Sequence, residues 1–162
     1  MPLSDLRPHL VLVSEREGVR EGWRLPTVEE LMSIVDDSQA CPTVDPVAFP
    51  DTPKATFWTA SRCEDDPGCA WVVDFAMGES DTEPMECRHF VRLCRRTGVL
   101  ETWPPGTIYD SRTSLLWQRF VVAEEWSEEA GHRIGSGLRM TWNEAVHRFD
   151  GANSTKTQRY FA

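Results

Sequence analysis

The sequence predicts an α+β fold in which two short helices pack on a small antiparallel sheet with long loops. Two capping boxes, at Thr27 and Thr141, each precede apolar residues with the spacing of an amphipathic helix. Between these helices, short segments alternate apolar and polar residues and are separated by turn-forming residues, which is typical of antiparallel strands. At 162 residues the chain has the length of one domain, or of parts of two.

The first clear element is a helix over about residues 28–36. Thr27 is a good N-cap, and Glu30 lies three residues later, where its carboxylate completes a capping box. The apolar face of this helix consists of Val28, Leu31, Met32 and Val35. Trp23 precedes the helix as a large apolar anchor, and residues 10–13 further upstream predict a short strand.

Prolines dominate the segment that follows the first helix. Four prolines within residues 42–53 exclude a helix and predict an ordered loop, with Phe49 as its apolar pin. The next predicted strands are residues 56–60, 70–75 and 89–94, and together they indicate an antiparallel meander. Residues 61–69 and 76–88, which connect these strands, are predicted to be loops.

The second half of the chain contains another hairpin and another helix. The predicted strands of the hairpin are residues 107–109 and 114–118. Residues 124–137 are polar and contain three glycines, so a loop is predicted there. The helix begins at Trp142, directly after the second capping box. Its apolar face consists of Trp142, Ala145, Val146 and Phe149.

Negative charge is concentrated in one part of the chain. The formal net charge is −9, and eight acidic residues lie between Arg62 and Arg88 with no lysine or arginine among them. These residues are Glu64, Asp65, Asp66, Asp74, Glu79, Asp81, Glu83 and Glu86. Binding of nucleic acid requires a basic face, so a nucleic-acid partner is not expected. The acidic segments are expected to be solvated, and they leave cations or basic partners open.

Neither a membrane span nor an export signal is indicated. Every apolar run is shorter than the roughly 18 residues that a membrane-spanning helix needs. The start of the chain lacks the apolar region of a signal peptide. The sequence as written therefore predicts a cytoplasmic protein, unless its true start lies upstream.

The cysteines do not indicate a disulfide framework. There are five, Cys41, Cys63, Cys69, Cys87 and Cys94, and an odd count without a signal peptide argues against full pairing. Cys63 and Cys69 flank a turn and are the pair to test first if the protein is exported. The cysteines are too scattered to supply the close ligand pairs of a zinc site, so no metal site is expected from them.

Motifs of catalysis are absent from the sequence. There is no Gly-x-Ser-x-Gly, no P-loop and no His-Glu-x-x-His, so no enzymatic activity and no cofactor are expected. The acidic loops offer oxygen ligands without the spacing of an EF-hand, so calcium binding stays an open alternative. The candidate ligand-binding residues are Asp65, Asp66, Glu79, Asp81, Glu83 and Trp103.

The tryptophans divide into two groups by their surroundings. Five lie in apolar, periodic segments and are predicted to pack in the core, namely Trp23, Trp58, Trp71, Trp117 and Trp142. Trp103 and Trp126 lie in polar segments and are better placed for contact with a ligand. Arg24 is predicted to be structural, paired with a carboxylate or with loop carbonyls.

A series of spaced motifs lies within residues 20–96. They are GWRLPT at 22–27, EL at 30–31, FP at 49–50, FWT at 57–59, AWVVDF at 70–75 and VR at 91–92. Together they resemble the Lcl C-terminal domain family. The resemblance implies a C-type-lectin-like fold in proteins that are usually exported or at the bacterial cell surface. Some members of the family look like adhesins that bind sulfated polysaccharide.

Further motifs in the second half resemble the opening of the same family. They are YDSRTSLLWQR at 109–119, with Ser114 where members usually carry glycine, and TWNEA at 141–145. In the family this opening precedes the Trp-Arg-Leu-Pro segment, whereas here it follows. The chain is therefore either a circular permutant or the back of one repeat joined to the front of the next.

A single closed module over residues 1–162 is expected, with 20–96 as its back part and 107–162 as its front part. The second helix would then pack beside the first, and one core would bury the apolar faces of both. Natural termini that lie close together make such a permutation physically reasonable.

The expected function is that of a non-enzymatic, C-type-lectin-like binding module. Its ligand, a carbohydrate or a protein, would meet the loops around residues 61–69 and 76–88, whose acidity argues against a sulfated glycan. An alternative is an assembly module that completes its fold with another copy, as a homodimer formed by exchange of halves. A formylglycine-generating type of oxidoreductase, which would use Cys87 and Cys94, is the most distant alternative.

Overall fold

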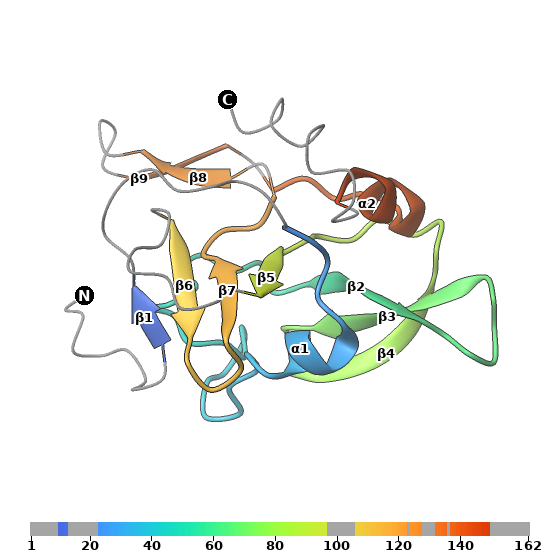
Figure 1. Ribbon diagram of the computed structural model, residues 1–162, viewed down its shortest axis with the longest axis horizontal. Coiled ribbons are helices and arrows are strands. Elements are labelled where there is room, and N and C mark those ends of the chain that lie inside the picture. Colours follow the sequence, from blue (N-terminus) through green and yellow to red (C-terminus); the bar gives the residue numbers. More distant parts are fainter. Residues whose placement is uncertain are drawn as a thin grey trace.

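Figure 1 shows a computed structural model of the chain, which describes residues 10–12, 23–96, 106–122, 124–127, 132–135 and 137–149. Within these residues the fold is α+β, as predicted, with two short helices and antiparallel sheets. The elements are β1 (Leu10–Leu12), α1 (Val28–Met32), β2 (Thr56–Arg62), β3 (Cys69–Asp74), β4 (Glu79–Pro84), β5 (Cys94–Arg96), β6 (Thr107–Asp110), β7 (Leu115–Gln118), β8 (Glu124–Ser127), β9 (His132–Gly135) and α2 (Trp142–Arg148).

The strands form more than the one small sheet that was expected. A four-stranded sheet has the order β1-β6-β7-β5, and a three-stranded sheet has the order β2-β3-β4. The hairpin β8-β9 forms a separate two-stranded sheet, so the prediction of a loop is wrong for residues 124–127 and 132–135. All of these strand pairs are antiparallel.

Within the β2-β3-β4 sheet, the β2–β3 pair is apolar on both faces. Phe57 lies opposite Val73 across the β2–β3 pair, and Trp58 lies opposite Val72. Residues directly opposite each other share a face, and successive residues point to opposite faces. Phe57 and Val73 accordingly pack in one buried cluster, and Trp58 and Val72 pack in another.

The two helices cover opposite faces of this sheet. Leu31 of α1 is in the cluster of Phe57, whereas Trp142 of α2 is in the cluster of Trp58. Figure 1 shows α1 and α2 apart, with β2 between them in this view. The expectations that the second helix packs beside the first and that one core buries the apolar faces of both are therefore wrong. A sheet that is apolar on both faces needs a cover on each, so each helix buries its apolar face in its own cluster.

Both parts of the chain contribute to each cluster. The cluster under α1 includes Ile108, Leu115, Trp117 and Val121 from the second part, together with Phe49 and Phe75 from the first. The cluster under α2 includes Leu116, Val122, Met140 and Trp142, together with Leu25 and Leu93. The alternating side chains of β7 explain this division, because Leu116 packs in one cluster while Leu115 and Trp117 pack in the other.

The helices begin where their capping boxes predict. Thr27 and Thr141 accept hydrogen bonds from the backbone N–H groups of Glu30 and Glu144, whose side chains bond back to the caps. The first helix ends at Met32 rather than near residue 36, because Val35 forms an antiparallel bridge with Val44 of the proline-rich loop. Phe49 is buried in that loop, as predicted.

The third strand of the meander is β4 rather than residues 89–94. β4 pairs with β3 over six residues, from Asp74 opposite Glu79 to Cys69 opposite Pro84. Residues 79–84 lie within the predicted loop over residues 76–88, because this strand has no apolar face that would mark it. His89 and Phe90 instead form isolated bridges, with Met140 and Phe57, and the following strand, β5, pairs with β7.

Four of the five tryptophans predicted to be core are buried, namely Trp23, Trp58, Trp117 and Trp142, whereas Trp71 is half-buried. Trp58 Nε1 donates to Met140 O at 2.8 Å, and Trp142 Nε1 donates to Thr59 O at 2.9 Å. A buried indole N–H needs an acceptor, and here each of the two finds a backbone carbonyl on the other segment. These two hydrogen bonds connect the start of α2 to β2. Among the described residues, no helix has the length and hydropathy to cross a membrane.

Candidate functional site

The acidic residues predicted to bind a ligand lie in two places. Asp65 and Asp66 are exposed in the turn between β2 and β3. Glu79, Asp81 and Glu83 alternate along β4, so their side chains share one face of this edge strand. The four residue steps from Glu79 to Glu83 span about 13 Å along the strand, so the three carboxylates do not converge on one ion. Trp103 lies outside the described residues.

Asp66 shapes its own turn. Its Oδ1 accepts a hydrogen bond from the backbone N–H of Gly68 at 2.8 Å, and its Oδ2 accepts one from Cys69 Sγ at 3.3 Å. These hydrogen bonds lower the pKa of the exposed Asp66 carboxyl. Across the same hairpin end, the backbone N–H of Cys63 donates to Cys69 O, and neither cysteine is in a disulfide bond. Local hydrogen bonds therefore stabilise this acidic turn.

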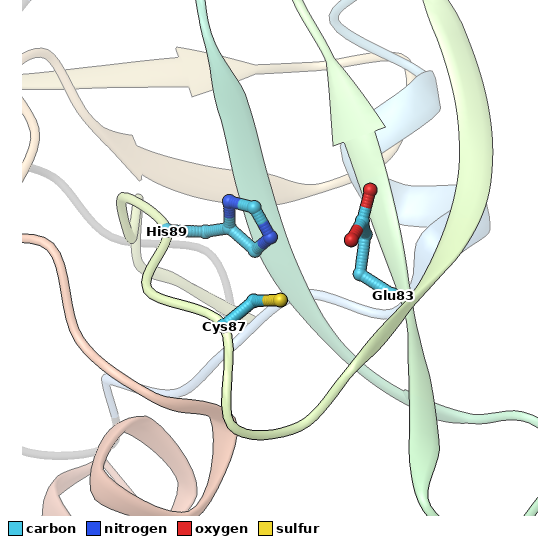
Figure 2. Close-up of side chains that lie close together, drawn as sticks. All are labelled: Glu83, Cys87 and His89. Carbon is cyan, nitrogen blue, oxygen red and sulfur yellow. The ribbon is translucent and has the colours of Figure 1, made fainter.

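A second group of side chains converges at the end of β4. Glu83, Cys87 and His89 place a carboxylate oxygen, a sulfur and a ring nitrogen within 4.8 Å of one another. Figure 2 shows the three side chains meeting between β4 and the segment that carries Cys87 and His89. We call these residues the Glu83–Cys87–His89 cluster. Sequence reasoning identified Glu83 but missed Cys87 and His89 as its neighbours.

Backbone hydrogen bonds fix the segment that positions this cluster. The backbone N–H of Cys87 donates to Pro84 O at 3.0 Å, which closes a turn directly after β4. The backbone N–H of Met85 donates to Gly68 O at 2.9 Å, and the Met85 side chain is buried. His89 exchanges backbone hydrogen bonds with Met140 at 3.0 and 2.9 Å. The turn thus folds Cys87 and His89 back beside Glu83.

The half-buried side chain of His89 packs against Trp58. Its ring meets the ring of Trp58 edge-on, with the centroids 4.7 Å apart. Burial lowers the pKa of His89, and Arg139 lowers it further, whereas Glu83 raises it. His89 Nε2 is buried and has no hydrogen-bond partner among the described residues. This nitrogen therefore needs a partner that the described side chains do not supply.

Cys87 faces acidic groups. Burial raises the pKa of its thiol, and so do the charge of Glu83, a hydrogen bond to Glu83 and the charge of Glu86. The thiol is therefore protonated at neutral pH when no cation is present. The cluster offers nitrogen, sulfur and oxygen donors together, and these are the donor types that zinc uses in proteins.

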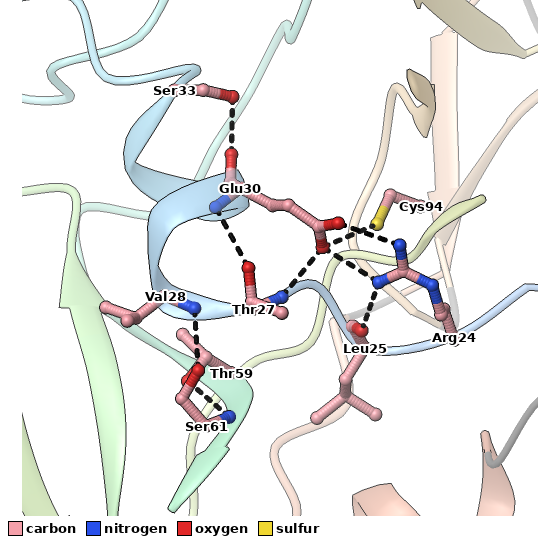
Figure 3. A network of polar contacts seen from close by, with 9 residues as sticks. All are labelled: Arg24, Leu25, Thr27, Val28, Glu30, Ser33, Thr59, Ser61 and Cys94. Atoms are coloured by element: carbon pink, nitrogen blue, oxygen red, sulfur yellow. Dashed lines mark hydrogen bonds and ion pairs between the residues drawn. The ribbon is translucent and has the colours of Figure 1, made fainter. Parts of the chain in front are cut away.

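A separate polar network surrounds Arg24, as Figure 3 shows. Arg24 Nη1 and Nη2 each donate to a carboxylate oxygen of Glu30, both at 2.8 Å. Glu30 also accepts from the backbone N–H of Thr27 at 2.8 Å, and Arg24 Nη1 donates to Leu25 O at 3.1 Å. Arg24 is therefore structural, as predicted, because its fork-shaped guanidinium is engaged within the fold.

Cys94 lies on the same network. Its thiol donates to Glu30 Oε2 at 3.8 Å, and burial raises its pKa to about 12. Cys94 packs in the cluster under α1, whereas Cys87 packs against the cluster under α2. A reactive cysteine requires a stabilised thiolate, which this environment disfavours.

Arg92 is a buried cation to which sequence reasoning assigned no role. Its Nη1 donates to Gln118 O at 3.0 Å and to Arg119 O at 2.6 Å, and its Nη2 donates to Thr52 Oγ1 at 2.9 Å. Its guanidinium also lies over the ring of Phe49, 4.7 Å from the centroid. Arg92 thereby ties the proline-rich loop to the end of β7 and has a structural role.

Comparison with known proteins identifies a family. The family model of the Lcl C-terminal domain matches residues 11–95, which is just over half of the chain. The matched part contains α1, the β2-β3-β4 sheet and the Glu83–Cys87–His89 cluster, and it ends within β5. No curated protein and no solved structure matches the chain.

Proposed function

The chain belongs to the Lcl C-terminal domain family, and from this membership we propose that it is a non-enzymatic binding module with a C-type-lectin-like fold. Its ligand is a protein or carbohydrate surface, and the contact is made by the acidic face of β4 with the β2–β3 turn. Because the family resemblance implies proteins at the bacterial cell surface, we propose that the binding takes place there.

The exposed edge strand β4 is the observation that carries the proposal. β4 is the last strand of its sheet, and Glu79, Ser80 and Asp81 are exposed on it. An edge strand presents unpaired backbone groups to a partner. Carboxylates along such an edge favour a cationic segment and disfavour a sulfated glycan. The proposed ligand is therefore basic or uncharged.

A permuted order of the family motifs fits the sheet topology. The part that resembles the back of the family ends at β5, and the part that resembles its opening begins at β6. β5 and β6 flank β7 in one sheet, so strands from the two parts lie side by side. This arrangement supports a circularly permuted, single closed module over residues 1–162.

Binding can be tested on peptide and glycan arrays, each probed with and without Ca²⁺. The chain is expected to bind lysine- and arginine-rich peptides or uncharged glycans, and the double variant Glu79→Gln/Asp81→Asn is expected to lose most of that signal. A control with the same charge change, Glu29→Gln/Asp37→Asn, alters exposed residues outside β4 and should bind as the original chain does. Binding to sulfated glycans, or equal binding by both double variants, would contradict the proposal.

An assembly module is the second candidate. Each buried cluster contains side chains from both parts of the chain, and the same contacts can form between two copies that exchange halves. An obligate dimer at micromolar concentration would favour this candidate. The oxidoreductase alternative has less support, because Cys94 and Cys87 pack in different clusters.

A further inference from the structure

We propose that Glu83, Cys87 and His89 form a binding site for a divalent transition-metal ion, with zinc as the ion that fits them best. The site is separate from the acidic row of β4 except for Glu83, and it does not depend on the proposed binding function. The proposal differs from the expectation from sequence, in which the scattered cysteines argue against a metal site.

The geometry of the cluster supports metal binding. The three donor atoms lie within 4.8 Å of one another, and donors around a tetrahedral zinc ion are roughly 3.5 Å apart. Binding would therefore require the side chains of Glu83 and Cys87, both half-buried, to turn toward the ion. The backbone on both sides is already fixed, by β4 and by the bridge of His89 to Met140.

The unpartnered nitrogen of His89 is an independent indication. A buried polar atom normally has a hydrogen-bond partner, and Nε2 of His89 has none among the described residues. A metal ion at the centre of the cluster would accept the lone pair of this nitrogen. On binding, the ion would replace the proton of the Cys87 thiol, which is released to solvent.

The types of donor atom in the cluster favour zinc over calcium and magnesium. Calcium and magnesium prefer oxygen ligands alone, whereas a thiolate and an imidazole beside one carboxylate suit zinc. Three protein ligands leave a fourth position for water or for a group of a bound ligand. The ion would also tie the end of β4 to the segment that pairs with Met140, next to α2.

Titration with cobalt(II) under reducing conditions tests the site, because a cobalt–thiolate bond produces a charge-transfer absorption band. The chain is expected to bind one equivalent of cobalt with this band, and added zinc should displace it. In Cys87→Ser the band should be lost and cobalt should bind at least about a hundredfold more weakly. Cys63→Ser removes another half-buried thiol of the chain and should keep the band.

Two further variants keep the test decisive if Cys87→Ser folds poorly. Glu83→Gln should keep the band and weaken cobalt binding by about tenfold or more. Glu79→Gln removes a carboxylate from the same face of the same strand and should leave binding unchanged. A chain without the band, a band that survives Cys87→Ser, or equal affinities for Glu83→Gln and Glu79→Gln would overturn the proposal.

Discussion

Replacement of Glu30 by alanine is expected to lower the free energy of unfolding by about 2–3 kcal/mol. Loss of the reciprocal capping bond to Thr27 contributes about 1 kcal/mol. Loss of the two hydrogen bonds from Arg24 contributes about 1–2 kcal/mol more. This second figure is kept small because the Arg24 and Glu30 side chains are 31% and 18% exposed, so solvent screens the pair.

Denaturation in urea measures this change, and thermal unfolding should show a midpoint lowered by about 4–12 °C. Glu29→Ala is the matched control, because Glu29 is the neighbouring carboxylate in the same first turn but is exposed. The control should cost less than about 1 kcal/mol. Equal losses for the two variants would refute the reasoning that the Arg24–Glu30 pair secures the start of α1.

The same pair predicts a dependence on pH. The hydrogen bonds from Arg24 lower the pKa of Glu30 below its ordinary value of 4.5, against the effect of burial. A carboxyl whose pKa is lowered by folding stabilises the fold above its unfolded pKa, and this contribution is lost as pH falls through the folded pKa. The stability difference between the chain and Glu30→Gln should therefore be constant near neutral pH and shrink in acid. A difference that grows in acid would contradict this sign.

Three other outcomes are expected. Trp142→Phe removes the buried hydrogen bond to Thr59 O and should cost about 2 kcal/mol in urea denaturation; a loss below about 0.5 kcal/mol would contradict that bond. Gly137→Ala would place a methyl group 2.7 Å from a ring carbon of Phe90 and should cost about 1–3 kcal/mol by the same assay, whereas unchanged stability would show that the contact can relax. Cys94 should resist iodoacetamide in the folded chain while the exposed Cys41 reacts, as mass spectrometry would show; equal labelling would contradict its burial.

Local signals allowed the starts of the helices to be predicted, whereas the end of the first helix and the strand pairing depend on long-range contacts. Thr27 with Glu30 is a capping signal that depends on adjacent residues, so the start of α1 could be predicted from sequence. β4 carries acidic and hydroxyl side chains, so its sequence does not predict a strand. Only the structure shows that it pairs with β3. Alternation of apolar residues marks strands with one buried face, and β4 has none.

The candidate site was predictable in part for the same reason. The acidic segments were visible as composition, so Glu83 was among the predicted ligand residues. Its proximity to Cys87 and His89 depends on the turn that the hydrogen bond from Cys87 N–H to Pro84 O closes. No sequence motif predicts this turn. A cysteine two residues before a histidine, just after an acidic segment, is the signal that could have indicated the cluster.

The most direct test of a single closed module is the mass of the chain in solution. Sedimentation equilibrium at micromolar concentration should give the mass of one chain, 18.5 kDa, because both buried clusters are completed within one copy. A mass of two chains that persists on dilution would contradict the closed module and would indicate that the halves are exchanged between copies.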